Sequence, residues 1–270
     1  MKTMNRKLDK DFIVHFKEGG KYHKLLSAVK ADHELTLEIR INSEIKVYYN
    51  KGLVLTLSRK GEKPLSDGYC RDSVKPKLDL NSPETYLDAA KRLIISHSRK
   101  IEFTIQQKIA AANQLSDSEY FVVDMEWQYP QGDIPETERL YKSRIDIVAV
   151  ERSTNDIVLF ELKQGTGALS GDSGVDGHYH KSSLLMGNND FCRHLEQDVR
   201  NILNDKVELG LIDYEIPERF GIVKQMFIYA YDKDAARERY ERNFAFELEK
   251  LGVSSIYIDT RFNDYGLQRK

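Results

Sequence analysis

Residues 144–165, RIDIVAVERSTNDIVLFELKQG, restrict the fold of this chain more than any other stretch. Branched apolar residues fill two short runs, and a Ser-Thr-Asn-Asp turn separates them, which is the pattern of a β-hairpin. We therefore predict strands at residues 145–150 and 156–163. Because almost every position in both runs is apolar, we expect both faces of these strands to be buried.

Three charged residues interrupt the hairpin: Asp146 in its first strand, and Glu161 and Lys163 in its second. Glu161 and Lys163 are two positions apart, so they point to the same face of the sheet. A turn at residues 153–156 would place Asp146 near the level of both. A buried charge is costly unless it is paired or binds a metal. The trio predicts a metal-dependent phosphodiesterase site, and a structural ion-pair network is the alternative.

An Asp in one strand followed by Glu-x-Lys in the next resembles the PD-(D/E)xK nuclease superfamily, which has the restriction-endonuclease-like fold. The resemblance covers roughly residues 84–260 in the order of elements. The usual Pro before the first acidic residue is absent, since Ile145 precedes Asp146. The resemblance implies an α/β core whose mixed sheet is flanked by helices.

The resemblance also implies the roles of individual residues. Asp146, Glu161, the Leu162 carbonyl and Glu102 would hold one or two Mg²⁺ or Mn²⁺ ions through hard oxygen atoms. The metal would polarise the phosphate and lower the pKa of the attacking water. Lys163 would position that water or stabilise the pentavalent charge. Glu102 lies at the start of a second predicted helical run, residues 101–113, and its alternative role is a solvated helix carboxylate.

The sequence as a whole predicts two domains, a strand-rich one at residues 1–80 and a nuclease-like one at residues 81–270. Residues 11–60 have the pattern of a small antiparallel meander of three or more strands, whose role is open. Residues 59–81 contain prolines and glycines among charges and are the best candidate for a linker. A helix is expected to begin at Ser82, because a Ser N-cap is followed by Pro and Glu.

Residues 119–127 are the predicted first strand of the core. Asp124 and Glu126 alternate within it, share one face, and could add acidic ligands or line the sheet edge. A strand, a helix and a last strand are predicted from residue 224 to residue 259, which favours a mixed sheet flanked by helices.

Residues 165–177 contain five glycines in 13 positions and fit neither a P-loop nor a dinucleotide-binding fingerprint. We expect a loop that ends in His178, Tyr179, His180 and Lys181, which would contact phosphate or, through the tyrosine, stack on a base. The alternative is an exposed polar loop, and a His-x-His zinc site lacks further ligands of the right kind. Gln197, with Arg193 one turn away on a predicted amphipathic helix, is a weaker candidate for substrate contact.

Composition restricts the class of protein. The longest apolar runs fall short of the roughly 20 residues that a membrane span requires, and the N-terminal residues have no apolar core typical of a signal peptide. Two distant cysteines indicate a reducing compartment, so we expect a cytoplasmic protein without structural zinc. No Ser-His or Cys-His arrangement supports covalent hydrolysis.

The net charge of −2 is unevenly distributed. Residues 1–80 have 17 Lys and Arg against 11 Asp and Glu, a net charge of +6, which leaves −8 for the remainder. A basic N-terminal part would suit phosphate contacts, although ordinary surface charge explains it equally well. We therefore expect a nuclease that acts on nucleic acid, DNA favoured, with no membrane partner and with homodimerisation left open. A nuclease-like binding module for nucleic acid or protein, with its chemistry lost, is the alternative.

Overall fold

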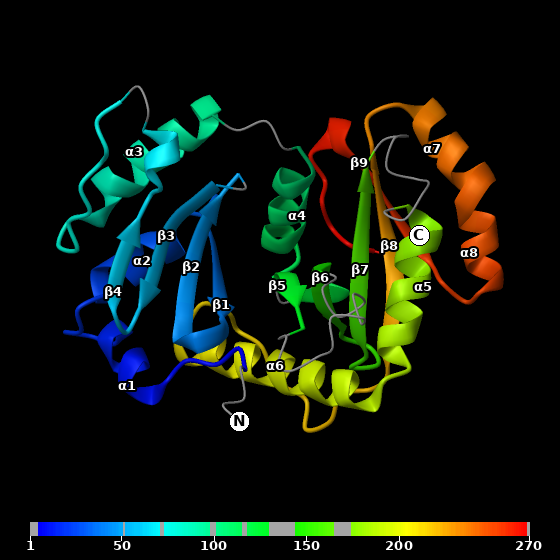
Figure 1. Ribbon diagram of the computed structural model, residues 1–270, viewed down its shortest axis with the longest axis horizontal. Helices are drawn as coiled ribbons and strands as arrows, with labels where there is room; N and C mark the ends of the chain where they lie inside the picture. The colour runs from blue at the N-terminus through cyan, green and yellow to red at the C-terminus, as the bar shows by residue number, and fades with distance from the viewer. Residues whose placement is uncertain are drawn as a thin grey trace. The chain divides into compact units, whose positions relative to one another are not determined.

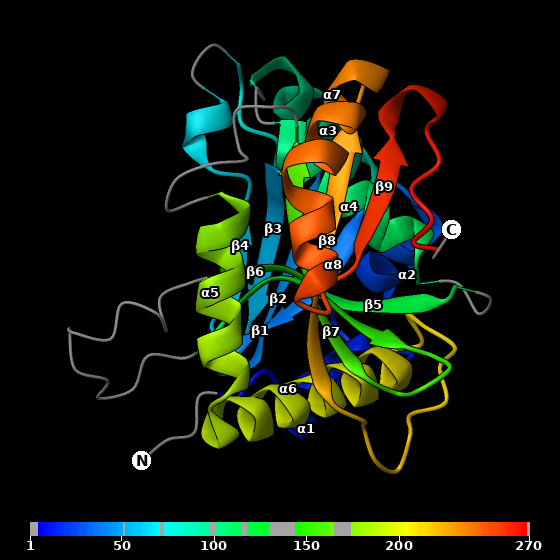
Figure 2. The same cartoon turned by 90° about the vertical axis from the view of Figure 1, so that its right-hand side faces the viewer.

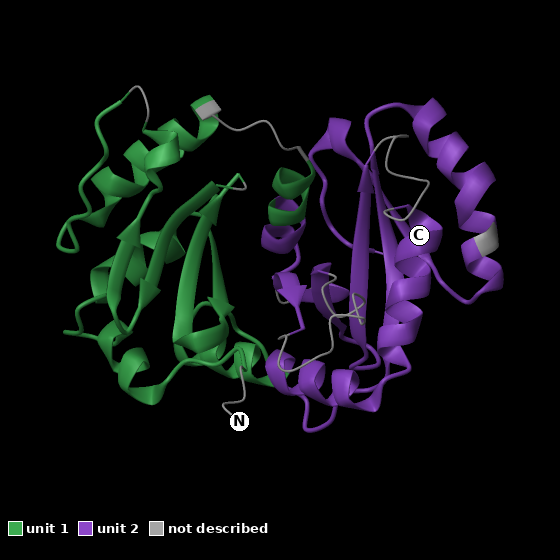
Figure 3. Cartoon of the chain, viewed as in Figure 1, with its two compact units in different colours: residues 1–107, 200–214 green, residues 108–199, 215–270 purple. Residues whose placement is uncertain are grey.

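The computed structural model describes residues 5–50, 52–70, 73–97, 101–114, 118–129, 144–164 and 174–268. The chain divides into two compact units, which are coloured separately in Figure 3. Unit 1 comprises residues 1–107 and 200–214, and unit 2 comprises residues 108–199 and 215–270. Among the described residues no helix is long and apolar enough to cross a membrane.

Unit 1 is built on a four-stranded antiparallel sheet with the strand order β1-β2-β3-β4 (Figure 1). The predicted antiparallel meander is therefore confirmed. The elements, in chain order, are α1 (Lys10–Ile13), a 3₁₀ turn (Val14–Phe16), α2 (His23–Ala31), β1 (Thr36–Arg40), a 3₁₀ turn (Ile41–Ser43), β2 (Glu44–Tyr49), β3 (Gly52–Ser58), β4 (Gly61–Pro64), a 3₁₀ turn (Asp67–Tyr69) and α3 (Pro83–His97).

The linker expected at residues 59–81 is wrong at its start, because β4 pairs with β3 from Ser58↔Gly61 to Leu55↔Pro64. Gly61 allows the tight turn between the two strands, since its φ of 112° suits only glycine. After β4 the chain stays attached to the unit. The backbone N–H of Leu65 donates to the Tyr86 hydroxyl at 2.7 Å, and that hydroxyl donates to the Val54 carbonyl at 2.6 Å.

The boundary expected at residue 80 lies inside unit 1, and two contacts explain why. The Tyr86 hydroxyl bonds attach α3 to the sheet of this unit. Residues 200–214 belong to it as well, because Lys206 is buried with its Nζ 3.3 Å from Glu38 Oε2 on β1. A contact between residues so distant in sequence gives no local signal in the amino-acid pattern.

Unit 2 contains a five-stranded mixed sheet with the strand order β5-β6-β7-β8-β9. The first three strands are antiparallel, and β7, β8 and β9 are parallel, so the predicted mixed sheet flanked by helices is confirmed. Figure 2 shows α5, α7 and α8 beside this sheet. The elements are β5 (Tyr120–Gln128), β6 (Arg144–Glu151), β7 (Ile157–Gln164), α5 (Val175–Met186), β8 (Val223–Tyr231), α7 (Asp234–Tyr240), a π-helical turn (Glu241–Ala245), α8 (Phe246–Lys250), β9 (Ser255–Asp259) and a 3₁₀ turn (Thr260–Phe262), while α4 (Ile101–Ala112) and α6 (Asn189–Glu208) each have residues in both units.

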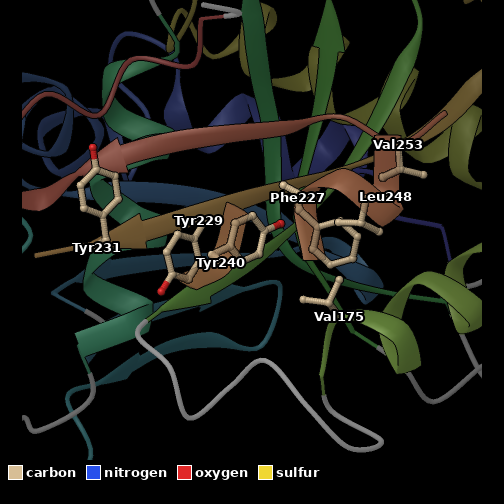
Figure 4. Packing of buried hydrophobic residues seen from close by; sticks show 8 residues of the cluster. Val175, Phe227, Tyr229, Tyr231, Tyr240, Leu248 and Val253 are labelled. Carbon is tan, nitrogen blue, oxygen red and sulfur yellow. The ribbon is translucent and has the colours of Figure 1, made fainter. Parts of the chain in front are cut away.

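An aromatic cluster joins the helices of unit 2 to strand β8 (Figure 4). The rings of Tyr229 on β8 and Tyr240 on α7 stack with centroids 4.2 Å apart and planes 7° from parallel. Val175, at the start of α5, is fully buried in the same cluster. Because stacked aromatic rings and a buried aliphatic side chain resist displacement, this packing fixes the first turn of α5 against the sheet.

Unit 1 also contains a buried carboxyl group, Asp205 on α6, which is 4% exposed. Its Oδ2 accepts a hydrogen bond from the Leu8 backbone N–H at 2.6 Å. Burial raises the pKa of Asp205 to about 6, although that hydrogen bond and the nearby Lys7 ammonium favour the charged form. The ionised carboxylate is therefore a cost to the fold at neutral pH.

We predict that Asp205→Asn stabilises the protein at pH 7 by roughly 1–3 kcal/mol and has little effect at pH 4. The pKa of about 6 in the folded state exceeds the value of about 3.9 expected when unfolded. The folded state therefore binds more protons between these values, and the free energy of unfolding falls as pH rises across that window. The asparagine removes the charge but retains an acceptor for Leu8. Urea unfolding between pH 4 and 7 measures the effect, and the exposed Asp213→Asn is the control. A less stable Asp205→Asn at pH 7 would contradict the prediction.

Candidate active site

The hairpin of β6 and β7 brings Asp146 beside Glu161. The two strands pair from Val150↔Ile157 to Ile147↔Phe160, so Asp146 and Glu161 are the next residues along each strand. At this point the Asp146 side chain replaces a backbone acceptor, because the Leu162 N–H donates to its Oδ2 at 2.8 Å. The predicted hairpin, and the predicted level of Asp146 within it, are confirmed.

Glu161 and Lys163 lie on the same face of β7, as their spacing predicted. Lys163 Nζ is 3.2 Å from Glu161 Oε1, and the two residues are 4% and 5% exposed. Strand β7 lies inside the sheet with a neighbour on each side, and α5 covers the face of Glu161 through His178. With so little water to screen it, the attraction between the two charges is stronger than at the surface.

Aromatic residues of β8 lie next to this pair. In the parallel register Glu161 is the partner of Phe227, and Lys163 is the partner of Tyr229. Partners in adjacent strands place their side chains on the same face of a sheet, and both aromatic residues belong to the buried cluster. The cluster therefore keeps one side of the charged pair away from water.

A histidine from α5 also contacts Glu161, and the sequence did not predict this contact. His178 Nδ1 is 2.7 Å from Glu161 Oε1, the same oxygen atom that Lys163 approaches. Gln225 on β8 donates through Nε2 to the His178 carbonyl at 3.5 Å. The sequence interpretation expected His178 to contact substrate, whereas the structure places it against a carboxylate.

The expected loop ending in His178, Tyr179, His180 and Lys181 is wrong for these four residues, because all of them lie within α5. Glycines at positions 174 and 177 obscured the helix, which is held by packing on β8 rather than by helix propensity. Residues 175, 179, 182 and 186 recur at helical spacing, which is the signal that could have identified it. Residues 165–173 of the glycine-rich stretch lie outside the described residues.

The other predicted substrate contacts have different surroundings. Tyr179 packs against the aromatic cluster, and Lys181 is half-buried. His180 and Gln197 are exposed. Contact of these residues with substrate stays a prediction.

The three other acidic candidates, Glu102, Asp124 and Glu126, lie in different environments. Glu102 is exposed on the part of α4 that belongs to unit 1, and its role as a metal ligand stays a prediction. On the edge strand β5 the register shifts between Val122 and Asp124, and Glu126 has a left-handed φ of 54°. Asp124 is fully buried and accepts from its neighbour's N–H, while Glu126 forms an ion pair with Arg144 at 3.1 Å. A role for either residue as an acidic ligand stays a prediction.

The donor atoms at the hairpin fit a hard divalent cation. In the part of the chain that the structure describes, no group of three or more His, Cys, Asp or Glu side chains could hold a metal ion. Magnesium, however, commonly binds through one or two carboxylates while water and substrate phosphate complete its coordination. Asp146, Glu161 and the Leu162 carbonyl supply hard oxygen atoms of that kind, in contrast to the nitrogen and sulfur that zinc prefers.

Comparisons with protein-family models, with curated proteins and with solved structures find no match for this chain.

We predict that Lys163→Met lowers the free energy of unfolding by about 3–5 kcal/mol in the absence of metal, because the Glu161 carboxylate would lose its buried ammonium partner. The double variant Glu161→Gln/Lys163→Met should recover much of this loss, since neither charge remains. Urea unfolding in the presence of EDTA measures all three proteins.

Arg144→Met is the control, because it breaks an ion pair in which the Arg144 side chain is 65% exposed. Its cost should be below about 1 kcal/mol. If Lys163→Met cost no more than this control, the buried ion pair would not contribute to the metal-free fold.

Proposed function

We propose that the chain is a metal-dependent nuclease of the PD-(D/E)xK superfamily, which hydrolyses phosphodiester bonds of nucleic acid, with DNA favoured. The observation that carries the proposal is the hydrogen bond from the Leu162 N–H to Asp146 Oδ2 at 2.8 Å. It joins the carboxylate of β6 to the Glu-x-Lys step of β7, which are the two parts of the superfamily's motif.

The topology of unit 2 supports the same proposal. Helix α4 precedes three antiparallel strands, and β8 follows the helices α5 and α6 to pair in parallel with β7. This order is the one on which the resemblance to a restriction-endonuclease-like core rests. We therefore propose that unit 2 has that fold.

The proposed chemistry assigns a distinct role to each charged group. Asp146, Glu161 and the Leu162 carbonyl would hold Mg²⁺ or Mn²⁺, which when bound supplies charge neutralisation for the scissile phosphate. Lys163 presents a buried ammonium 3.2 Å from Glu161. An ammonium held there can donate to the attacking water or to a phosphate oxygen, in surroundings where little solvent competes.

His178 has a supporting role in this proposal. Its Nδ1 lies 2.7 Å from Glu161 Oε1, and its helix is anchored by Val175 in the aromatic cluster. A group that hydrogen-bonds a metal-binding carboxylate fixes the orientation of that carboxylate. We assign His178 to positioning Glu161 rather than to binding substrate.

One observation favours the alternative of a nuclease-like module without catalysis. Glu161 Oε1 already has Lys163 and His178 within 3.2 Å, so this oxygen is satisfied without a metal. A structural ion-pair network would have the same contacts. Metal binding therefore distinguishes a catalytic site from a structural ion-pair network.

We predict that Mn²⁺ raises the melting temperature of the wild type by several degrees, because a ligand in hundredfold excess over its Kd stabilises by about 2.7 kcal/mol. Asp146→Asn should melt at or above the metal-free wild type, since the amide oxygen can still accept from Leu162, and should lose the response to Mn²⁺. Glu249→Gln, which removes an exposed carboxylate of α8, should retain the response. Thermal-shift measurements with and without Mn²⁺ provide the comparison.

The nuclease proposal would be refuted if Asp146→Asn were less stable than the wild type and if neither Mn²⁺ nor Mg²⁺ changed the melting temperature of the wild type. That result would favour the ion-pair network, in which Asp146 balances a buried ammonium.

We also predict that Lys163→Met abolishes cleavage but leaves the affinity for Mn²⁺ within a few fold of the wild type. The reason is that the ammonium acts on water or phosphate, whereas the metal is bound by oxygen atoms. Calorimetric titration measures the affinity, and circular dichroism establishes that the titrated variant is folded. Loss of metal binding together with cleavage would assign Lys163 to the structure of the site.

A further inference from the structure

Unit 1 contains an open cavity of about 1060 Å³, which is lined by the N-terminal segment, the turn between β1 and β2, and the turn between β3 and β4. Its charged lining is predominantly basic, with five cations against the carboxylates of Asp9 and Glu44. The cations are Lys7, Lys10, Arg59, Lys60 and Lys63. Three separate segments of the chain thus bring positive charges to one cavity.

The four lysines of the cavity are exposed, and none forms an ion pair with any described residue. Arg59 differs, since it pairs with Asp9 at 2.9 Å. Ammonium groups gathered at one cavity repel one another and create a positive potential that an anionic ligand would neutralise.

The surroundings of the cavity carry the same sign of charge. Lys46, on β2, has a pKa lowered by burial and further lowered by Arg40, Arg6 and Lys63, against the opposing effect of Glu44. The lysine Lys63 of the cavity therefore lies in a locally positive field. An approaching polyanion would relieve the repulsion among these cations.

The backbone at the cavity wall is strained. Asn42 and Ser43 are consecutive residues with left-handed φ angles of 61° and 57°. Ser43 is nearly buried, and its Oγ accepts from the Asp9 N–H at 2.8 Å, which holds the N-terminal segment at the wall. Left-handed conformations of non-glycine residues are costly and persist where surrounding contacts enforce them, often at ligand-binding sites.

We propose that this cavity binds the phosphate backbone of duplex DNA. The choice of nucleic acid rests on the function proposed for unit 2, while the anionic chemistry follows from the lysines. Duplex is favoured over single strands because the described residues of the lining include no aromatic side chain on which an unpaired base could stack. Lysines recognise phosphates as point charges, so the binding is independent of base sequence and strongly salt-dependent.

The test uses the full chain with Lys60→Glu/Lys63→Glu. Fluorescence anisotropy with a short labelled duplex of mixed sequence, in EDTA to prevent cleavage, gives the affinity over a series of salt concentrations. We expect at least a tenfold loss of affinity and a salt slope shallower by about two, because each lost phosphate contact removes about 0.9 from the slope. Lys60→Gln/Lys63→Gln should give a smaller loss in the same direction.

Lys30→Glu/Lys77→Glu is the matched control, since it changes the charge of unit 1 equally at two exposed positions outside the cavity. The control should bind as the wild type does apart from a small, uniform electrostatic effect. Melting temperatures within a few degrees of the wild type establish that each variant is folded. Equal affinities and slopes for the two charge-reversed variants would overturn the inference, as would a wild type that does not bind duplex at low salt.

Cleavage assays distinguish this inference from the proposed function. If the wild type cleaves DNA and Lys60→Glu/Lys63→Glu binds and cleaves it equally well, the role of the cavity in DNA binding is refuted and the proposed nuclease activity is retained. Conversely, if that variant loses duplex binding and the wild type cleaves no nucleic acid with Mg²⁺ or Mn²⁺, DNA binding by the cavity is retained and the proposed nuclease activity is refuted.

Discussion

The end of the β6–β7 ladder is the point on which the candidate site depends. A backbone N–H at the centre of a sheet needs an acceptor, and for Leu162 the acceptor is the Asp146 carboxylate rather than a carbonyl of β6. This substitution places a side-chain charge where a strand would otherwise continue its pairing. Glu161 and Lys163, on either side of Leu162, lie at the same end of the ladder and are almost fully buried. Two carboxylates and an ammonium consequently lie at one end of the hairpin, where Glu161 and Lys163 are buried and Asp146 is half-buried.

Strand β8 connects this site to the rest of unit 2. Phe227 and Tyr229 are the register partners of Glu161 and Lys163, and both also belong to the cluster that holds α5 and α7. The same aromatic residues therefore reduce solvation of the charged pair and fix the helix that carries His178. Packing and electrostatics are coupled here, because displacing α5 would remove the His178 contact with Glu161 at 2.7 Å. A loss of aromatic packing would therefore change the orientation of the Glu161 carboxylate.

The sequence could predict the elements whose pattern is local. The hairpin, its register and the shared face of Glu161 and Lys163 follow from a period of two and a clear turn. Helix α5 could not be predicted in that way, since glycine-rich neighbours hide a helix that tertiary packing stabilises. The short edge strand β4, GEKP, has the composition of a linker and is recognised only by its pairing with β3. The extent of unit 1 likewise depends on Lys206 and Glu38, whose separation in sequence leaves no periodic signal.

The Lys206–Glu38 pair provides an internal reference for the Lys163–Glu161 pair. Both are buried, and their nitrogen–oxygen distances are 3.3 Å and 3.2 Å. The charge beside each pair differs in sign. Beside the first pair lies a cation, because Arg40 Nη1 is 3.9 Å from Glu38 Oε2. Beside the second pair the hydrogen bond from the Leu162 N–H holds a further carboxylate, Asp146, and His178 lies 2.7 Å from Glu161. A pair that serves only to satisfy buried charge has no need of a second carboxylate, whereas a divalent cation does. The second carboxylate beside Glu161 is therefore the feature by which this pair differs from Lys206–Glu38, and it is the feature on which the proposed metal site depends.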